Sequence, residues 1–208
     1  MSDVTSLFWD LGGVVLSNGW DQDSRSAAAK LFSFDFIDYE ERHKRAEVGF
    51  ETGAMTLEAY LDQTVFFRER PFTREQFKEF MFAQSKENRE TRTLLDELTA
   101  SRRYFLAALN NESLELNTYR IRKFGLARNF VAFFTSCYLR TRKPDPLIFR
   151  LALGIAQRAA EECVFIDDRP ENLEPAKALG MHVIHFQSAG QLRASLEESG
   201  FKRVLVGG

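Results

Sequence analysis

The stretch FWDLGGVVLSNG, residues 8–19, joins an apolar run to an acidic residue, two glycines and a second apolar run. A short apolar run followed by a Gly-rich turn is typical of a buried β-strand that ends in a tight loop. Asp10 then stands at the carboxyl end of that strand. An Asp before glycines is also a common turn residue, so this stretch alone leaves two interpretations open, a capped turn and a functional carboxylate.

Four further apolar runs have the same character. They are continuous rather than alternating, which favours a parallel sheet covered on both faces. The segments between the later runs show helical spacing, as in Leu147, Ile148, Leu151 and Ile155. The predicted strands are 4–9, 104–109, 131–136, 163–167 and 182–186. This alternation predicts an α/β fold whose core is a Rossmann-like, doubly wound parallel sheet.

A long segment without a convincing strand separates the first strand from the second. The helical segments predicted within it are 21–32, 36–50, 56–67 and 74–83. Thr73 and Gln76 have the spacing of a capping box, which predicts that the last of these helices begins at residue 74. We therefore predict a core domain formed by residues 1–16 and 89–208, with an all-helical cap, residues 17–88, inserted into it.

Composition restricts the class of protein. The 208 residues are 44% hydrophobic and include 20 Phe, which is enough for a sizeable core. The 28 basic and 30 acidic residues are mixed, so no charge pattern indicates binding to nucleic acid. The chain has 2 Cys without a CxxC pair and no apolar run of the roughly 20 residues that span a bilayer. The first residues, MSDVTS, lack the basic region and apolar stretch expected of a secretory signal. We expect no nucleic-acid or membrane partner, a cytoplasmic location, and a monomer or a homodimer.

Polar residues follow several of the predicted strands. Asp10 ends the first strand, Asn110 follows the second, and Asp167 and Asp168 end the fourth, while Lys143 comes a few residues after the third. In an open parallel sheet, ligands bind beyond the carboxyl ends of the strands, where the strand order reverses. We therefore expect these side chains to converge at one edge of the sheet.

Most of these residues also have an ordinary structural interpretation. Asn110 could begin a loop, Lys143 could be a solvated loop residue, and DDRPEN (167–172) could be a helix start with Pro170 in its first turn. The adjacent carboxylates of Asp167 and Asp168 are harder to explain in this way, because buried carboxylates repel one another unless a cation is present. Mg²⁺ prefers such hard oxygen ligands and would remove that cost.

In this order, the residues closely resemble the motifs of the haloacid dehalogenase (HAD) superfamily, in the branch that inserts a helical cap after the first motif. Within it, the chain resembles the bacterial sugar-phosphate phosphatases of the glucose-1-phosphatase type and the N-terminal phosphatase domain of soluble epoxide hydrolases. The resemblance covers 1–16 and 89–208, and FETGAMTLEAY (50–60) resembles part of their cap. It implies a hydrolase, and first of all a Mg²⁺-dependent phosphatase that acts on a small phosphorylated metabolite.

The resemblance also implies catalytic and phosphate-binding roles. Asp10 matches the nucleophile that forms an aspartyl-phosphate, and Lys143 in RKPDP matches the lysine that holds the nucleophile and the phosphoryl oxygens together. Asn110 stands at the second-motif position, which is normally Ser or Thr, and Asn111 matches an Asn of the near relatives. Together with Lys143, these two asparagines are the implied phosphate-binding residues.

The implied magnesium ligands are Asp10, the main-chain carbonyl of Gly12, Asp168 as a direct ligand and Asp167 in support, with Asn172 as a further polar group nearby. The chemistry is consistent with this set. A phosphate ester is an anion that is attacked by a second anion, so the site must neutralise the repulsion between them. One lysine and one Mg²⁺ ion would do so.

Gly12 departs from the pattern of the family phosphatases. They carry a second Asp at this position, which protonates the leaving alcohol and later activates water, a contribution on the order of 10²- to 10⁴-fold in rate. Three functions therefore stay open: a slow phosphatase with a substitute for that acid, a non-hydrolytic protein that binds phosphate esters, and a haloacid dehalogenase. Because a dehalogenase has no need of magnesium, Asp167 and Asp168 count against the last.

The cap offers candidate specificity residues. They are Trp20, Arg42, His43, Arg45 and Glu51. The helix YEERHKRAE (39–47) is also typical of a solvated surface, so none of the five is assigned a role. His182 and His185 flank the apolar centre of the last predicted strand and are interpreted as structural.

Overall fold

The computed structural model describes residues 4–198 and contains a five-stranded parallel sheet with the strand order β3-β2-β1-β4-β5. The strands are β1 (Ser6–Trp9), β2 (Phe105–Asn110), β3 (Ala132–Thr135), β4 (Cys163–Asp167) and β5 (His182–His185). The expected parallel α/β core is therefore confirmed, and each predicted strand lies within two residues of an observed one. Strand β1 is central, and the strand order reverses there.

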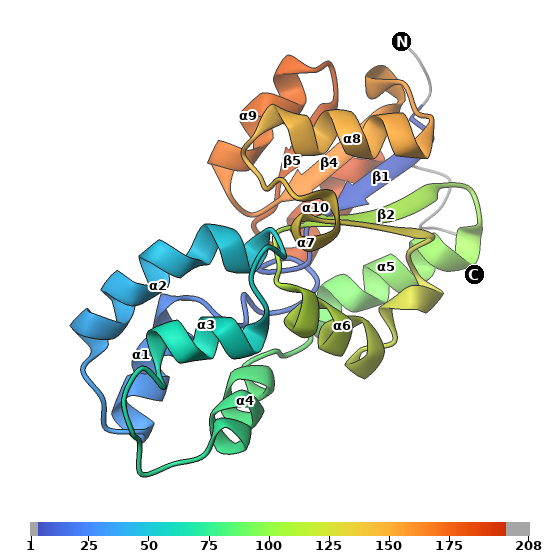
Figure 1. Ribbon diagram of the computed structural model, residues 1–208. Helices are drawn as coiled ribbons and strands as arrows, with labels where there is room; N and C mark the ends of the chain where they lie inside the picture. Colours follow the sequence, from blue (N-terminus) through green and yellow to red (C-terminus); the bar gives the residue numbers. More distant parts are fainter. Residues whose placement is uncertain (1–3, 199–208) are drawn as a thin grey trace.

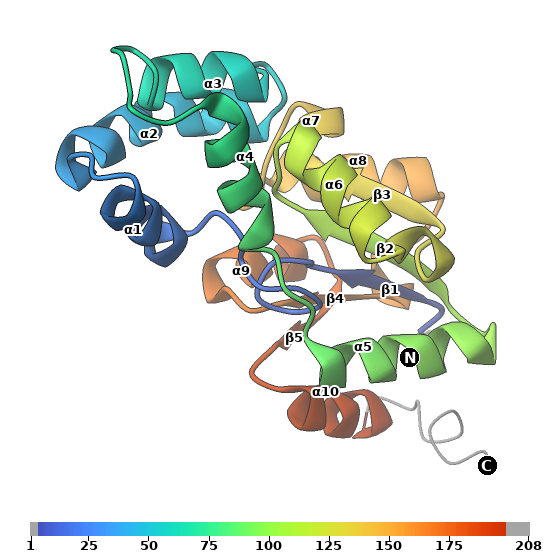
Figure 2. The ribbon, with the colours of Figure 1, turned by 90° about the horizontal axis from the view of Figure 1, so that it is seen from below.

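Helices cover both faces of the sheet. Figure 2 shows α5 (Arg89–Ser101) and α10 (Ala189–Leu196) on one side, with α8 (Pro146–Ala156) on the other. Helix α9 (Pro170–Ala178) joins α8 in a shared hydrophobic cluster. The remaining core helices are α6 (Leu114–Lys123), α7 (Ser136–Leu139) and the 3₁₀ helices η1 (Leu126–Arg128) and η2 (Ala160–Glu162).

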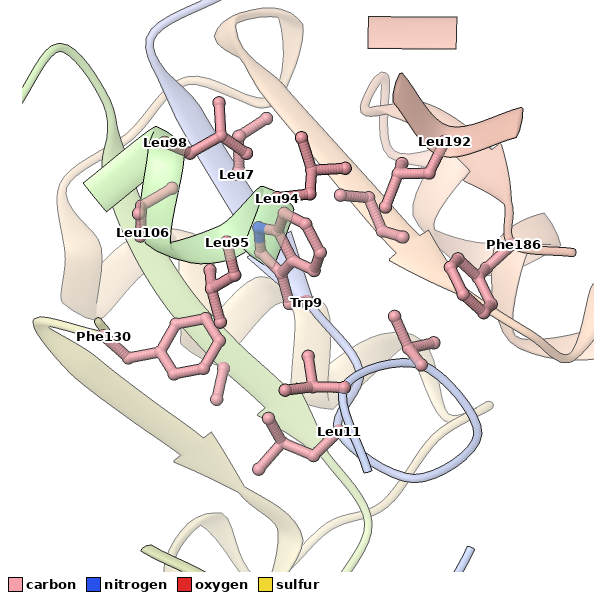
Figure 3. Close-up of a cluster of buried hydrophobic side chains, with 14 of the residues drawn as sticks. Leu7, Trp9, Leu11, Leu94, Leu95, Leu98, Leu106, Phe130, Phe186 and Leu192 are labelled. Atoms are coloured by element: carbon pink, nitrogen blue, oxygen red, sulfur yellow. The ribbon is translucent and has the colours of Figure 1, made fainter. Parts of the chain in front are cut away.

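The alternation of side chains along β1 builds a separate core on each face. Leu7 and Trp9 pack with Leu94, Leu95 and other residues of α5, as Figure 3 shows. Phe8 points to the opposite face, into the cluster formed by α8 and α9. Full burial of one such side chain contributes about 1.5–3 kcal/mol, so both faces fix β1 in place. Asp10 directly follows this strand.

The segment between β1 and α5 contains the helices α1 (Gln22–Leu31), α2 (Phe36–Glu51), α3 (Leu57–Thr64) and α4 (Arg74–Ala83). We call them the cap, which lies to one side of the sheet in Figure 1. Thr73 and Gln76 form the predicted capping box. Aromatic side chains fill the interior of the cap; Trp20, for example, packs edge-on against Phe77 at 5.7 Å between ring centroids.

Two connectors join the cap to the core, and they run side by side. Leu16 forms an antiparallel bridge with Glu87. Ser17 N donates to Lys86 O at 2.8 Å, and Ser17 Oγ donates to Gln84 O at 2.8 Å. The two chain connections between the cap and the core therefore lie next to each other. Within residues 4–198, every helix is too short or too polar to cross a membrane.

Candidate active site

The sheet places Asp10 and Asp167 next to each other. Asp10 follows β1 and Asp167 ends the neighbouring strand β4, so both side chains emerge at the carboxyl edge where the strand order reverses. Asp10 N donates to Ile166 O at 2.8 Å, which extends the strand pairing to the site. The functional interpretation of Asp10 thus gains support over a simple turn cap.

Lys143 lies between these two carboxylates. Its Nζ is 2.8 Å from Asp10 Oδ1 and 2.6 Å from Asp167 Oδ2, and all three side chains are buried. Burial raises the pKa of Asp10 to about 7, and Asp167 adds to the rise, whereas Lys143 opposes it. Burial favours neutral Lys143, but the two carboxylates outweigh this effect and raise the pKa of the lysine. The three groups form one buried charge network.

The start of α9 holds Asp167 in place. Arg169 N donates to Asp167 Oδ1 at 2.8 Å, and Asn172 Nδ2 lies 3.0 and 3.1 Å from the two carboxylate oxygens. Pro170 occupies the first turn of the helix. Asn172, which we noted as a nearby polar group, therefore contacts Asp167 directly and orients it towards Lys143.

Asp168 completes a group of three carboxylates that could hold a metal ion. Asp10, Asp167 and Asp168 each offer an oxygen atom, and these atoms lie within 4.8 Å of one another. Asp168 Oδ1 is buried without a hydrogen-bond partner among residues 4–198, and burial and Asp167 raise the pKa of this carboxyl group. A buried, unpartnered carboxylate oxygen beside two other carboxylates fits a divalent cation with oxygen ligands.

Gly13 allows Asp168 to approach the loop after β1. Its φ is +76°, and a Cβ added there would lie 2.1 Å from Asp168 Oδ2. Only glycine meets both the backbone and the space requirement at this position. The second glycine of the opening stretch is therefore needed for the carboxylate cluster.

Gly12 lies on the wall of the cavity, and its neighbour Asn18 occupies the adjacent space. A Cβ added to Gly12 would lie 3.1 Å from Asn18 Oδ1 and 3.9 Å from a guanidinium nitrogen of Arg120. Asn18 therefore crowds the place that an acidic side chain at position 12 would enter.

The two asparagines after β2 have different surroundings. Asn111 Oδ1 accepts a hydrogen bond from Lys143 N at 2.8 Å, and Asn111 Nδ2 donates to Lys143 O at 2.9 Å. Asn111 therefore positions the main chain of Lys143. Asn110 is 1% exposed; its amide bonds to Asn117 and accepts from Thr135 Oγ1. Phosphate binding by Asn110 and Asn111 stays a prediction that rests on the resemblance.

Sequence reasoning missed Arg120 and Glu112. Arg120 is 1% exposed and donates to Ser85 Oγ, Ser17 O and Asn18 O at 3.1, 3.1 and 2.9 Å, which ties it to both cap connectors. It also pairs with Glu112 at 2.9 Å. Burial raises the pKa of Glu112 to about 7, against the effect of Arg120. Arg122 and Lys123 follow Arg120 in the same helix, and the sequence alone does not distinguish Arg120 from these two basic residues.

A cavity of about 460 Å³ lies between the cap and the core. Its core wall includes Asp10, Gly12, Asn111, Glu112, Lys143 and Asn172, and its cap-side wall includes Asn18, Trp20, Arg25, His43, Glu47 and Glu51. Three of the five cap candidates thus line it. Arg42 instead stacks 3.5 Å from the ring centroid of Phe67, and Arg45 is an exposed partner of Glu41.

Comparison with known proteins agrees with this geometry. Residues 4–180 match the haloacid dehalogenase-like hydrolase family. The chain therefore belongs to that family and is a hydrolase by membership.

Among the relatives, a chloroplast flavin mononucleotide hydrolase of Arabidopsis thaliana is 30% identical over 159 residues, which cover 76% of this chain and 64% of that protein. Bifunctional epoxide hydrolase 2 of Rattus norvegicus is 32% identical over 73 residues, 35% of this chain and 13% of that protein. The chain thus spans less than two thirds of the length of either relative.

Solved structures agree with the fold. A HAD family enzyme of Bacteroides thetaiotaomicron, crystallised as a magnesium complex, superposes with a TM-score of 0.76 at 22% identity. The match covers 91% of this chain and 96% of the other. At this identity the likeness concerns the fold, which is the α/β core with an inserted cap.

Proposed function

We propose that the protein is a Mg²⁺-dependent phosphatase that acts on a small phosphate ester through an aspartyl-phosphate intermediate. The observation that supports this most directly is the position of Lys143 Nζ between Asp10 and Asp167, with Asp168 beside them. Asp10 and Lys143 line the core side of the cavity. A cation next to a nucleophilic carboxylate is what attack on an anionic ester requires.

Asp10 is the proposed nucleophile. A carboxylate oxygen of Asp10 forms a bond to phosphorus while the bond from phosphorus to the ester oxygen breaks, and the leaving alkoxide takes a proton from water or from another cavity group, because position 12 carries no acid. Lys143 holds Asp10 in place and balances the negative charge of the phosphoryl group. Water then attacks the aspartyl-phosphate and releases phosphate, which restores Asp10.

Asp10, Asp167, Asp168 and the carbonyl of Gly12 are the groups that would hold Mg²⁺. Bound there, the ion would supply the positive charge that offsets the three carboxylates and the substrate phosphate. The unpartnered Oδ1 of Asp168 supports this assignment. The same carboxylate cluster argues against the dehalogenase alternative, which needs no metal ion.

Gly12 favours a second candidate function. Because position 12 carries no carboxyl group and Asn18 lies 3.1 Å from the place of its Cβ, the usual acid and base of family phosphatases is missing here. The alternative is a protein that binds phosphate esters without useful turnover. As a phosphatase, the protein would take its proton from water or another cavity group and would turn over slowly.

The cavity supports a small phosphorylated metabolite as the ligand. Its volume of about 460 Å³ is in the range of small-molecule sites. Flavin mononucleotide belongs in the test panel because a relative is named for its hydrolysis, and glucose 1-phosphate because of the motif resemblance. A cytoplasmic enzyme without nucleic-acid or membrane partners, as a monomer or a homodimer, is part of the same proposal.

Release of inorganic phosphate from these esters with Mg²⁺ tests the proposal, with wild type, Asp10→Asn and Gly12→Asp compared. Turnover by wild type and none by Asp10→Asn supports the aspartyl-phosphate route. If wild type releases no phosphate and Gly12→Asp does, the alternative function, binding of phosphate esters without turnover, is supported. If no variant releases phosphate from any ester, the phosphatase proposal is wrong.

A further inference from the structure

A chain of hydrogen bonds inside the cap ends at a cavity residue. Trp20 Nε1 donates to the hydroxyl groups of Tyr39 and Tyr60 at 3.2 and 3.1 Å, and these two hydroxyl oxygens are 2.7 Å apart. The hydroxyl group of Tyr60 lies 2.9 Å from Nδ1 of His43. All four side chains are buried except for small exposed fractions. They come from the segment before α1 and from α2 and α3, which lie side by side in Figures 1 and 2.

The network favours one assignment of donor and acceptor for each of its hydrogen bonds. Trp20 can only donate. If Tyr39 donates to Tyr60, then Tyr60 donates to Nδ1 of His43, and every hydroxyl proton has an acceptor. In the opposite direction, the hydroxyl proton of Tyr39 would have no acceptor among residues 4–198. Buried hydroxyl groups keep their hydrogen bonds, so the first arrangement is favoured.

This arrangement assigns the protonation of the His43 ring. Burial, helped by Arg25 and Arg142, lowers the pKa of His43 to about 4 against the opposing effect of Glu47 and Glu40, and therefore the ring is neutral at neutral pH. With Nδ1 accepting from Tyr60, the single ring proton is on Nε2. Nε2 has no hydrogen-bond partner within residues 4–198, and His43 lines the cavity that also contains Asp10.

We propose that His43 determines specificity by donating one hydrogen bond from Nε2 to an uncharged oxygen of the leaving group, such as a hydroxyl, ether or carbonyl oxygen. This inference rests on the proposed function. A neutral N–H group stabilises a bound acceptor oxygen but does not attract a second anionic group. The positively charged arginines of the same cavity would attract such a group. Tyr60 is the positioning residue, because it holds the ring in this tautomer.

Steady-state kinetics test the role of His43. Phenyl phosphate has no oxygen beyond its ester group, whereas glucose 1-phosphate and flavin mononucleotide have several. We expect His43→Phe to lower kcat/KM for the better of these two oxygen-rich esters by about 3- to 10-fold, the value of one neutral hydrogen bond, with a clearly smaller loss for phenyl phosphate. His43→Gln, whose amide can donate from a similar place, should restore part of the loss.

The tautomer is measured separately in the free protein. The chain has 3 His, so the imidazole ¹⁵N resonances can be assigned with His43→Gln as reference. We expect a proton on Nε2 of His43 in wild type and a tautomer mixture in Tyr60→Phe. Arg45→Gln is the matched control for a substitution in α2, since Arg45 is exposed and lies outside the cavity lining. It should change neither the ester kinetics nor the tautomer of His43. Thermal unfolding checks that each variant is folded.

The outcomes separate this inference from the proposed function. Equal losses for all esters in His43→Phe, or a proton on Nδ1 in wild type, overturn the inference alone. A wild type that hydrolyses none of the three esters overturns the inference and the proposed function together. A selective loss, its rescue by Gln and a proton on Nε2 support both.

Discussion

Lys143 Nζ lies 2.6 Å from Oδ2 of Asp167, with exposed fractions of only 3% and 0% for the two residues. An ion pair buried to this degree does not gain much stability over a well-packed apolar pair, because both charges lose their hydration. Removal of one partner is different, since it leaves the other charge buried and unpaired. Substitution of either residue should therefore lower the stability of the fold as well as alter the site.

Lys143→Met should destabilise the protein. The substitution keeps a long side chain but leaves Asp10 and Asp167 without a cation, and breaking a buried pair costs about 3–5 kcal/mol. Denaturant unfolding without metal measures the change in free energy. Adding Asp167→Asn to Lys143→Met removes the unpaired negative charge of Asp167 and should recover part of the lost free energy of unfolding. Equal stability of wild type and Lys143→Met would contradict the buried charge network.

Mg²⁺ should raise the thermal stability of the wild-type protein. An ion that binds only the folded state at 100 times its dissociation constant adds about 2.7 kcal/mol. Asp168→Asn should lose most of this shift, because its Oδ1 is the carboxylate oxygen without a protein partner. Glu174→Gln on the exposed face of α9 is the control and should keep the shift. A shift of the same size in Asp168→Asn would exclude Asp168 as a ligand.

Gly12→Asp should raise the rate of phosphate release more when Asn18 is made smaller. A Cβ at position 12 lies 3.1 Å from Asn18 Oδ1, so the new carboxyl group needs space that Asn18 now occupies. We expect Gly12→Asp/Asn18→Ser to exceed Gly12→Asp, within the roughly 10²- to 10⁴-fold range of a positioned acid. Gly12→Ala/Asn18→Ser provides the matched control without an acid. Similar rates for the double variant and this control would argue against position 12 as the place of the missing acid.

Glu112 should make stability depend on pH. Its pKa rises from an ordinary 4.5 to about 7 on folding, chiefly through burial. The contribution of this group is therefore fully present below pH 4.5 and is lost as the pH rises through 7. The free energy of unfolding of Glu112→Gln minus that of wild type should therefore rise by on the order of 3 kcal/mol between pH 4.5 and 7, whatever the loss of the pair with Arg120 adds at every pH.

Urea unfolding of both proteins at several pH values measures this difference, and the exposed Glu90→Gln variant serves as the control. Parallel pH profiles for wild type and Glu112→Gln would show that Glu112 titrates alike in the folded and unfolded states.

The sequence allowed prediction of the features that depend on strand ends. Asp10 and Asp167 directly follow apolar runs, and a parallel sheet brings such positions to one edge, so their proximity required no knowledge of the cap. Lys143 was predictable from the resemblance of RKPDP to the family motif, although its contact with both carboxylates was not. The capping box at Thr73 was predictable because it depends only on local spacing.

The site features that could not be predicted from the sequence depend on contacts between residues far apart in the chain. Arg120 and Ser85 are 35 residues apart and meet only because α6 packs beside the connectors. The orientation of Asn110 depends on Thr135 of a neighbouring strand. Likewise, His43 enters the cavity and Arg45 does not, although both come from the same charged helix, because helix packing decides which face of α2 is covered.

Arg120 links the chain segment that enters the cap to the segment that leaves it. Its guanidinium group bonds to Ser17 and Asn18 on one connector and to Ser85 at the end of the cap, and it is anchored through Glu112 next to the loop that holds Lys143. A second link lies at the end of α2, where Arg142 pairs with Glu51 at 2.6 Å, so a movement of the cap away from the core would break contacts at both places. Glu112 directly follows Asn111, and Arg142 directly precedes Lys143, so both links attach the cap to the loops that position the lysine. A displacement of the cap would therefore act on the reacting groups as well as on access to the cavity.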